Sequence, residues 1–441
     1  MVKLYCEQIE TEFLHESKEN FIRLDTSTNG NCRTDSKPSG KQPAQLRTHR
    51  DCRSDRAVYL PDLINLMGQG KPLPTSPFEP IPTISLFTGA GGIDLGFEVA
   101  GFSTQCCVEI DEYSCLTLDL NKSFGLRTGL HSFLREAFII CDDIRKVTPA
   151  RILNLANVKK GKLGLLHGGP PCQAYSVFGK RKGLEDERGT LLWDFVQTVN
   201  DLEPECFVLE NVEGLKSYNQ SSVLNELCER LSFGGRYTIS LHTYELADFG
   251  VPQFRKRIFI IGSLSGKSVP PMQTTHGLPD LINTFQKPYR TVGEVLEGLG
   301  EPGETILPNH VGRVHGLDIQ NRYNSLAFGE RDPKTRINRL APNRPSYTII
   351  VGSNKGGGKG HVHPSQPREV TPRESARMQT FPDFWGFSGT SRHPIRQVGN
   401  AVPPLFAALI AAHIRKYIFD DPISLTYEDA THYLGLDYLS R

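Results

Sequence analysis

Residues 81–92 read IPTISLFTGAGG, and this stretch decides the fold class of the chain. Its first residues are mostly apolar, and they lead into a turn that contains Gly89, Gly91 and Gly92 before a helical pattern begins. A strand, a glycine-rich turn and a helix in this order form the phosphate-binding start of nucleotide-binding α/β folds. The turn fits G-x-G-G and not G-x-G-x-x-G, because Asp94 occupies the last glycine position. Taken alone, the turn also fits a plain tight connection between a strand and a helix.

Apolar runs alternate with helical patterns after this turn. Such alternation predicts βαβ units and a mostly parallel sheet. The last two runs are joined by residues 245–256, a short connection with Gly250 and Pro252 but no helical pattern, so we expect them to be antiparallel. The expected fold class is α/β, a mostly parallel sheet with one antiparallel strand. The runs after the first are 104–108, 138–141, 163–167, 206–209, 237–244 and 257–261.

The composition excludes several classes of protein. The 441 residues are enough for two or three domains. Lys and Arg number 50 against 49 Asp and Glu, a net charge of +1, which excludes a histone-like chain and leaves nucleic-acid contact to a local basic patch. No apolar run approaches the ~18 residues of a membrane helix, and no secretory signal is visible. The ten cysteines show no metal-binding spacing, so we expect no metal site and a cytoplasmic protein.

Changes of character along the chain divide it into five segments. The first is polar, and we expect it to be mobile. The third is loop-rich, and regular structure returns after it with a capping box at Thr371 and Glu374 and a last long helix from Pro404. The expected segments are an N-terminal extension (1–78), the α/β domain (79–264), the loop-rich domain (265–370), a return to the α/β domain (371–420) and a C-terminal tail (421–441).

Two acidic residues at predicted strand ends extend the glycine-rich turn into a candidate cofactor site. Glu109 ends the second strand, 18 residues after Gly91, about where a carboxylate binds the ribose hydroxyls in such folds. Asp143 ends the third strand, where it can accept a hydrogen bond from an adenine amino group. The three features describe an adenosine-shaped site and do not separate NAD from S-adenosylmethionine.

The fourth and fifth strands end in residues that suit covalent catalysis. Cys172 follows two prolines at a strand end, where its thiolate can act as a nucleophile, although an unselected cysteine is more often structural. Glu210 ends the neighbouring strand and can protonate a ring nitrogen. Arg255 and Arg257 share one face by alternation and suit a carbonyl oxygen or a phosphate, or else form a solvated basic edge.

Six ordered segments together resemble the DNA (cytosine-5) methyltransferases of the bacterial restriction–modification type. The resemblance covers about residues 82–419. It implies a Rossmann-like domain that uses S-adenosylmethionine, a small loop-rich target-recognition domain, and a final helix beside the first strand. The segments are 87–92 (FTGAGG), 169–176 (GPPCQAYS), 210–212 (ENV), 253–257 (QFRKR), 371–377 (TPRESAR) and 396–404 (RQVGNAVPP).

The resemblance also implies roles for individual residues. Cys172 adds to C6 of a flipped-out cytosine, Glu210 binds N3, Arg257 holds O2 and Arg255 helps to order the site. Ile110 stands where the family often has an aromatic residue stacked on adenine. The implied cofactor-binding residues are Phe87, Gly89, Gly91, Gly92, Glu109, Ile110, Asp143, Ile144, Pro171, Leu191, Asn400 and Ala401.

We expect the DNA sequence to be read by residues 265–370, most densely between Arg331 and His363. Seven Lys and Arg residues accompany a single acid, Asp332, in that stretch. Arginine suits guanine and lysine suits phosphate, whereas the plainer interpretation is a solvated basic loop. The predicted DNA-binding residues are Gln253, Arg336, Arg339, Arg344, Lys355 and Lys359.

The implied partner is double-stranded DNA, which the protein binds as a monomer. No membrane partner is expected. The implied activity is DNA (cytosine-5) methylation that protects host DNA from a cognate restriction endonuclease, in the cytoplasm near the nucleoid. One alternative is a tRNA cytosine-5 methyltransferase, whose recognition lobe is small. A second is a degenerate DNA-binding or nucleotide-binding homologue, which the presence of Cys172, Glu210 and Arg257 argues against. A third, a dehydrogenase, accounts only for the glycines and Glu109.

Overall fold

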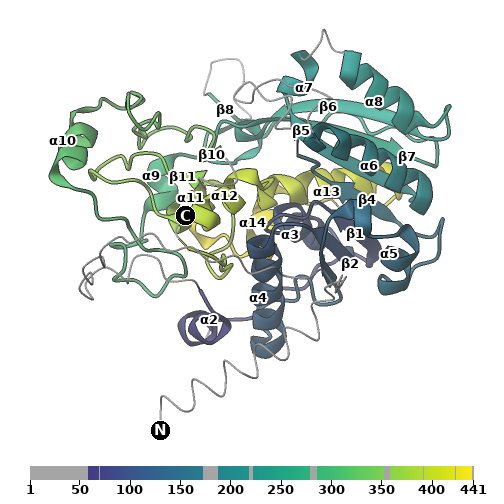
Figure 1. Ribbon diagram of the computed structural model, residues 1–441, viewed down its shortest axis with the longest axis horizontal. Coiled ribbons are helices and arrows are strands. Elements are labelled where there is room, and N and C mark those ends of the chain that lie inside the picture. The colour runs from purple at the N-terminus through teal and green to yellow at the C-terminus, as the bar shows by residue number, and fades with distance from the viewer. Residues whose placement is uncertain are drawn as a thin grey trace, which may run out of the picture.

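The computed structural model describes residues 58–68, 70–171, 187–217, 222–278, 286–351, 358–390, 392–422 and 424–439. In this part of the chain, a seven-stranded sheet has the strand order β3-β2-β1-β4-β5-β7-β6 (Figure 1). Each predicted apolar run is one of its strands. They are β1 (Ile81–Leu86), β2 (Phe102–Glu109), β3 (Phe138–Cys141), β4 (Leu165–Gly168), β5 (Cys206–Val212), β6 (Thr238–Glu245) and β7 (Lys256–Ser263).

The strand directions confirm the expected fold class. β1 pairs in parallel with β2 and β4, and the pairs β2–β3 and β4–β5 are also parallel. β7 is antiparallel to both of its neighbours, β5 and β6, so it alone reverses direction in this sheet. The carboxyl ends of β1, β2, β4 and β5 therefore meet at one edge, where ligands bind in open α/β sheets.

Helices cover both faces of the sheet because its strands are apolar on both faces. In β5, Cys206 and Val208 belong to one core and Phe207 and Leu209 to the other. The first core is covered by α3 (Gly92–Val99), α4 (Glu112–Thr128), α13 (Pro404–Ile418) and α14 (Tyr427–Leu434). The second core is covered by α5 (Pro149–Leu155), α6 (Glu187–Leu202), α7 (Gly214–Ser217) and α8 (Ser222–Ser232). Single 3-10 turns are η1 (Ile144–Lys146), η4 (Leu246–Phe249) and η5 (Asp437–Leu439).

The final long helix, α13, packs directly on α3, the helix that follows the glycine-rich turn. A Cβ atom at Gly96 of α3 would lie 2.4 Å from Ala408 N and from Pro404 O of α13, so only glycine allows the two helices to approach this closely. In the described part of the chain, Arg392–Ile418, which contains α12 (Arg392–Asn400) and α13, has the length and apolar composition of a membrane span. Its most apolar 18 residues are 83% buried inside the protein, so this segment is part of the protein core.

The packed core extends beyond both predicted ends of the α/β domain. Helix α2 (Leu60–Met67) packs on α4 with Leu60 and Leu63 buried, although residues 1–78 were expected to be a mobile extension. Residues 1–57 lie outside the described residues. Helix α14 packs on α3 and α13, although it falls in the predicted tail, residues 421–441. Both helices are only eight residues long, so the sequence alone does not show that they pack on the rest of the domain.

The loop-rich region lies to one side of the sheet, with α10 at its far end (Figure 1). It has a small core of its own, formed by Tyr323, Leu326, Ile337 and Val362. Val292, near its start, instead belongs to the main core, so the packing of the loop-rich region begins later than residue 265. Its elements are β8 (His276–Gly277), β9 (Lys287–Pro288), α9 (Val292–Leu296), α10 (Leu317–Ser325), β10 (Ile350–Val351) and β11 (Gly358–Lys359), and α11 (Pro372–Met378) follows it with the predicted capping box.

Candidate active site

The glycine-rich turn after β1 leaves space at one position and is closely packed at another. Gly89 has a φ of +59°, and nothing lies within 4 Å of the place where a Cβ atom would stand. Gly92 is the opposite case, because a Cβ atom there would lie 2.3 Å from Val402 O and 3.0 Å from Ala401 Cβ. The segment after α12 therefore packs against the turn, while the backbone at Gly89 remains open to an approaching ligand.

The Glu109 carboxylate ties the turn to the end of β2. One oxygen accepts from the backbone N–H of Gly89 at 2.7 Å, and the other accepts from Ile110 N at 2.9 Å and Asp111 N at 2.7 Å. Burial raises the pKa of Glu109, and these hydrogen bonds partly offset the increase. The Ile110 side chain beside it is 65% exposed, so the site offers an apolar surface next to a carboxylate.

The predicted adenine-side residues lie at the ends of neighbouring elements. Asp143 follows β3, and Arg145 donates to both of its carboxylate oxygens at 2.5–3.1 Å. This ion pair lowers the pKa of Asp143, so the acceptor proposed for adenine already has a cationic partner. Ile144 in η1, Leu191 in α6 and Pro171 after β4 are half-buried.

The ends of β4 and β5 lie side by side, as predicted. A Cβ atom at Gly169 would lie 3.0 Å from Glu210 Oε2, and the Asn211 side chain donates to Pro170 O at 3.2 Å. Cys172 lies outside the described residues. Pro171, the residue before it, is described and lies just after the end of β4, at this edge of the sheet.

Glu210 faces two arginines. Arg257 Nε lies 2.9 Å from Glu210 Oε1, and both side chains are about nine-tenths buried. Burial raises the pKa of Glu210, and the nearby Arg257 and Arg255 partly offset this effect. Arg255 is itself fully buried and donates to Ala401 O at 3.0 Å. The pair of arginines therefore connects the catalytic edge with the residues around Asn400, which is exposed.

Two predicted DNA-binding residues are occupied inside the protein. Gln253 is fully buried and donates to the Gln379 side chain at 2.7 Å, which differs from the surface position that the prediction requires. The Arg339 guanidinium donates to three backbone carbonyls of the loop-rich region, those of Asn324, Leu326 and Pro364. These internal bonds use the donors that guanine would need.

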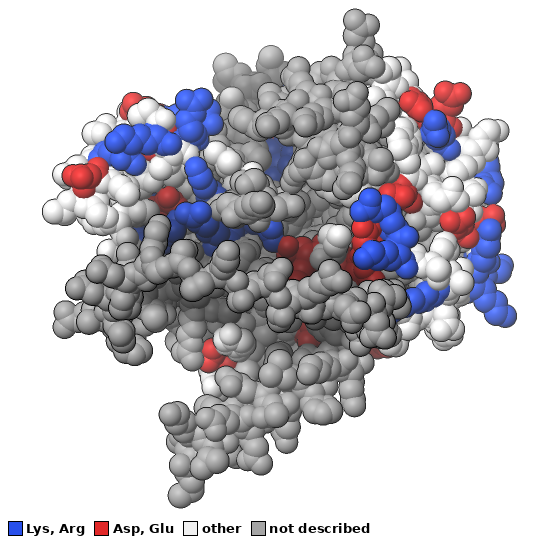
Figure 2. Space-filling model, viewed as in Figure 1, with Lys and Arg blue, Asp and Glu red and all other residues white. Residues whose placement is uncertain are grey.

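The remaining predicted DNA-binding residues are on the surface. Arg336, Arg344 and Lys359 are exposed, and Lys355 lies outside the described residues. Figure 2 shows Lys and Arg side chains over the lobe that carries α10 and in a row that leads toward the middle of the molecule. Acidic side chains are recessed there, beside residues that are not described.

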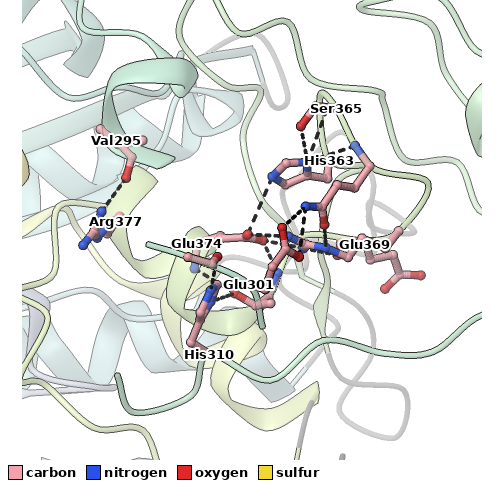
Figure 3. Close-up of polar contacts among 12 residues, drawn as sticks. Val295, Glu301, His310, His363, Ser365, Glu369, Glu374 and Arg377 are labelled. Atoms are coloured by element: carbon pink, nitrogen blue, oxygen red, sulfur yellow. Dashed lines mark hydrogen bonds and ion pairs between the residues drawn. The ribbon is translucent and has the colours of Figure 1, made fainter. Parts of the chain in front are cut away.

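A second polar cluster lies away from the strand ends (Figure 3). Arg368 donates to both Glu374 oxygens at 2.7 and 2.8 Å, and His363 Nε2 is 3.7 Å from the same carboxylate. His310 Nδ1 is 2.9 Å from the Thr371 hydroxyl. A cavity of about 490 Å³ adjoins this cluster. Arg368 and His363 both face the Glu374 carboxylate, so the cluster connects the loop-rich region to α11 and has a structural role.

Sequence reasoning did not identify a buried acid–imidazole pair behind the glycine-rich turn. Asp94 and His167 are almost fully buried, and Asp94 Oδ1 lies 3.6 Å from His167 Nε2. Burial raises the pKa of Asp94 to about 7 and lowers that of His167 to about 3, so near pH 5 both are neutral. The signal that was available was Asp94 itself, a carboxylate at a position where related turns have glycine.

Comparison with known proteins identifies the family. The model of the C-5 cytosine-specific DNA methylase family matches residues 81–416. The Type II methyltransferase M.NgoFVII of Neisseria gonorrhoeae is 32% identical over 352 residues, which cover 77% of this chain and 87% of that protein. The Type II methyltransferase M.AquIA of Picosynechococcus is 39% identical over 229 residues, 49% of this chain and 88% of that protein.

A solved structure supports the same assignment. It is a protein described as a DNA modification methyltransferase encoded within a prophage of E. coli. It is similar to this chain with a TM-score of 0.59 and 26% identity, over 77% of this chain and all of that one. The sheet order, the packed glycine-rich turn and the Glu210–Arg257 pair at the adjoining strand ends are consistent with the family match. This chain belongs to the C-5 cytosine-specific DNA methylase family.

Proposed function

We propose that this member of the family methylates cytosine at C5 within a specific sequence of double-stranded DNA, with S-adenosylmethionine as the methyl donor. One observation carries the proposal. The strand end that leads into Cys172 lies beside the Glu210–Arg257 pair, and the open Gly89 turn with Glu109 lies at the same edge of the sheet. We propose that the nucleophile next to Pro171, the acid Glu210 and the cofactor site act together at this edge.

The residues present fit the adenosine part of the cofactor. The turn is open at Gly89, the buried Glu109 carboxylate suits ribose hydroxyls, and Ile110 exposes an apolar side chain beside it. When bound, S-adenosylmethionine supplies an electrophilic methyl group. Phe87, Gly91, Gly92, Asp143, Ile144, Pro171, Leu191, Asn400 and Ala401 complete the proposed pocket.

The protein's own residues activate the cytosine. In the proposed mechanism, the Cys172 thiolate adds to C6, which makes C5 nucleophilic. Glu210 holds its proton at N3 during this addition, and its raised pKa suits that role. Arg257 holds O2, and Arg255 fixes the edge through Ala401. C5 then takes the methyl group that bound S-adenosylmethionine would supply, so that it carries this methyl group and its original proton. The C5 proton is lost to solvent, and the electron pair of the C5–H bond re-forms the C5–C6 double bond as the Cys172 thiolate leaves, which releases 5-methylcytosine. The base must leave the duplex to reach this site.

DNA contact is proposed for the exposed basic residues of the loop-rich region. Arg336 and Arg344 have the planar fork that suits guanine, and Lys359, with Lys355, suits phosphates. Arg339 is better suited to holding the region together, because its guanidinium is bonded internally. Recognition by a sizeable region of this kind favours DNA over tRNA as the substrate.

The names of the relatives suggest a biological role. Several are Type II methyltransferases, so we propose a cytoplasmic, monomeric enzyme that protects host DNA from a cognate restriction endonuclease.

The test measures transfer of a labelled methyl group from S-adenosylmethionine to duplex DNA, to tRNA and to no acceptor. Bisulfite sequencing of DNA from cells that express the chain then gives the site. We expect label in duplex DNA and one short methylated sequence. Label in tRNA alone would refute the proposal.

A further inference from the structure

Helix α12 binds the helix that starts at the cofactor site. Arg396 forms an ion pair with Asp111, the residue that caps the start of α4. His393 stacks on Tyr113 with ring centroids 3.9 Å apart, and Gln397 accepts from the Thr117 hydroxyl at 2.6 Å. Three side chains, spread along α12, therefore hold it to the first part of α4.

The opposite side of α12 contacts the β10–β11 hairpin of the loop-rich region. A Cβ atom at Gly358 of β11 would lie 2.6 Å from Arg396 N and from Ile395 Cγ2. A Cβ atom at Gly399 would lie 2.7 Å from Val351 Cγ2 of β10. These are direct contacts between α12 and the hairpin, so the hairpin cannot shift far without moving the helix (Figure 1).

Asp111 connects this helix to the cofactor carboxylate. Its backbone N–H donates to Glu109 Oε1, while its side chain accepts from Ser114 N at 3.0 Å and pairs with Arg396. Both ionic side chains are partly buried, 11% exposed for Arg396 and 29% for Asp111. The backbone that positions Glu109 is thus held by a residue of α12.

We propose that Arg396 is a positioning residue that couples the cofactor site to the DNA-reading hairpin through its ion pair with Asp111. Cofactor binding at Glu109 fixes the start of α4. Through Arg396 this fixes α12 and the hairpin that carries Lys359, so cofactor and DNA bind cooperatively. The inference rests on the proposed function, because it assigns DNA contact to the hairpin.

The experiment measures coupling between the two ligands. S-adenosylhomocysteine, which cannot donate a methyl group, is titrated into the full chain with and without a duplex that carries the sequence found by bisulfite sequencing. In the wild type we expect DNA to tighten cofactor binding by about 5- to 150-fold, the usual range of such coupling. Cofactor must tighten DNA binding by the same factor, because linkage is reciprocal.

Arg396→Gln should lower this factor well below the wild-type value while both ligands still bind singly. Some coupling should remain, because His393 and Gln397 still hold α12 to α4. Asp111→Asn keeps the acceptor that caps α4, so it should have the same effect, and the double variant should add nothing. Arg396→Lys should restore part of the coupling. Arg230→Gln, which breaks an exposed ion pair with Glu226 on α8, is the matched control and should keep the wild-type factor.

Three results would overturn the inference. The first is a coupling factor of 1 in the wild-type protein, and the second is an unchanged coupling factor in Arg396→Gln. The third is that Arg396→Gln weakens the binding of both ligands but leaves the coupling factor unchanged. The last result would mean that Arg396 only stabilises the fold. A wild-type chain that methylates no DNA would instead refute the proposed function, so the two failures are distinguishable.

Discussion

At the scale of single residues, Glu109 and Glu210 of the proposed site have different surroundings. Glu109 accepts three backbone N–H groups, so its oxygens are arranged to hold a turn and receive hydroxyl donors. Glu210 faces Arg257 and is buried, so it is poised between keeping a proton and pairing with a cation. The first arrangement suits binding and the second suits proton sharing with a ring nitrogen.

Cys172→Ala should abolish methyl transfer and leave S-adenosylmethionine binding largely intact, because only the nucleophile is removed. DNA with 5-fluorocytosine at the target should trap a covalent adduct with the wild type, since the fluorine cannot leave as a proton. Mass spectrometry of the complex checks both expectations. An adduct that still forms with Cys172→Ala would rule out this residue as the nucleophile.

Glu109→Ala should weaken S-adenosylmethionine binding and change the KM for DNA much less. Loss of a charged hydrogen-bond partner costs ~1.5–3 kcal/mol, roughly 10- to 150-fold in affinity. Calorimetric titration gives the cofactor Kd, and a thermal melt controls for loss of the turn that Glu109 also holds. Unchanged cofactor affinity in a folded variant would contradict the ribose role.

Asp94 should make the stability of the protein depend on pH. Burial raises its pKa from 3.8 to about 7, so between these values the folded chain binds a proton that the unfolded chain has lost. This contribution is therefore fully present below pH 3.8 and is lost as pH rises through 7. The loss is at most about 1.4 kcal/mol per pH unit.

The comparison with Asp94→Asn isolates this effect, because asparagine resembles the protonated acid and does not titrate. Urea unfolding at pH 5, 6, 7 and 8 should show the wild type losing stability relative to the variant as pH rises. His167 contributes with the opposite sign between pH 6.5 and about pH 3, because burial lowers its pKa over this range. Both proteins carry His167, so the comparison between them removes this contribution to first order. Parallel curves for the two proteins would show that Asp94 does not titrate in this range.

At the scale of elements, the crossing of α3 and α13 decides how the end of the chain reaches the cofactor turn. Gly96 allows the backbones to touch, and the same approach brings Val402 O against Gly92. Trp385 adds a hydrogen bond from Nε1 to Ala90 O at 3.1 Å. The turn is thus held from behind by segments about 300 residues later in the chain.

Gly96→Ala should destabilise the protein by roughly 1–3 kcal/mol, because the added methyl group would force α3 and α13 apart. Urea unfolding measures the change. Gly316→Ala is the matched control, since nothing lies within 4 Å of its added methyl group and its φ is −65°. It should cost less than about 1 kcal/mol, mainly as a weaker helix cap. Equal stabilities of the two variants would argue against the tight crossing.

At the scale of the whole molecule, we expect the sheet to carry the chemistry and the loop-rich region to carry the choice of DNA sequence. Tyr323 of α10 belongs to the smaller core together with Leu326, Ile337 and Val362, whereas Leu340 and Ile349 of the same loop-rich region pack into the main core. The near-neutral net charge of +1 makes the local excess of Lys and Arg in that region a distinct feature. We therefore expect the choice of DNA sequence to move with this region.

Grafting residues 298–370 onto a related methyltransferase should move the methylated sequence with the graft. Bisulfite sequencing of DNA from cells that express the chimera checks this. The reciprocal chimera controls for misfolding, because it should retain activity with the other specificity. A methylation pattern that stays with the catalytic sheet would place sequence choice outside this region.

The sequence alone determined the strands of the sheet and the antiparallel pair β6–β7, whereas the strand order came from the structure. Strands such as β3 and β5 are short, apolar runs bounded by turns, and this local pattern follows directly from burial on both faces. The antiparallel pair β6–β7 followed from a connection too short for a crossover helix. Strand-end residues such as Glu109 and Glu210 were found for the same reason, because parallel strands place their carboxyl ends at one edge.

Only the tertiary structure decided which side chains are free to act. Gln253 and Arg339 have the chemistry of DNA contacts, but partners distant in sequence occupy them, and no local pattern encodes those partners. The Asp94–His167 pair and the Asp111–Arg396 bridge likewise join residues 73 and 285 positions apart. Local periodicity records whether a position is buried, whereas hydrogen-bond partners depend on how the whole chain closes on itself.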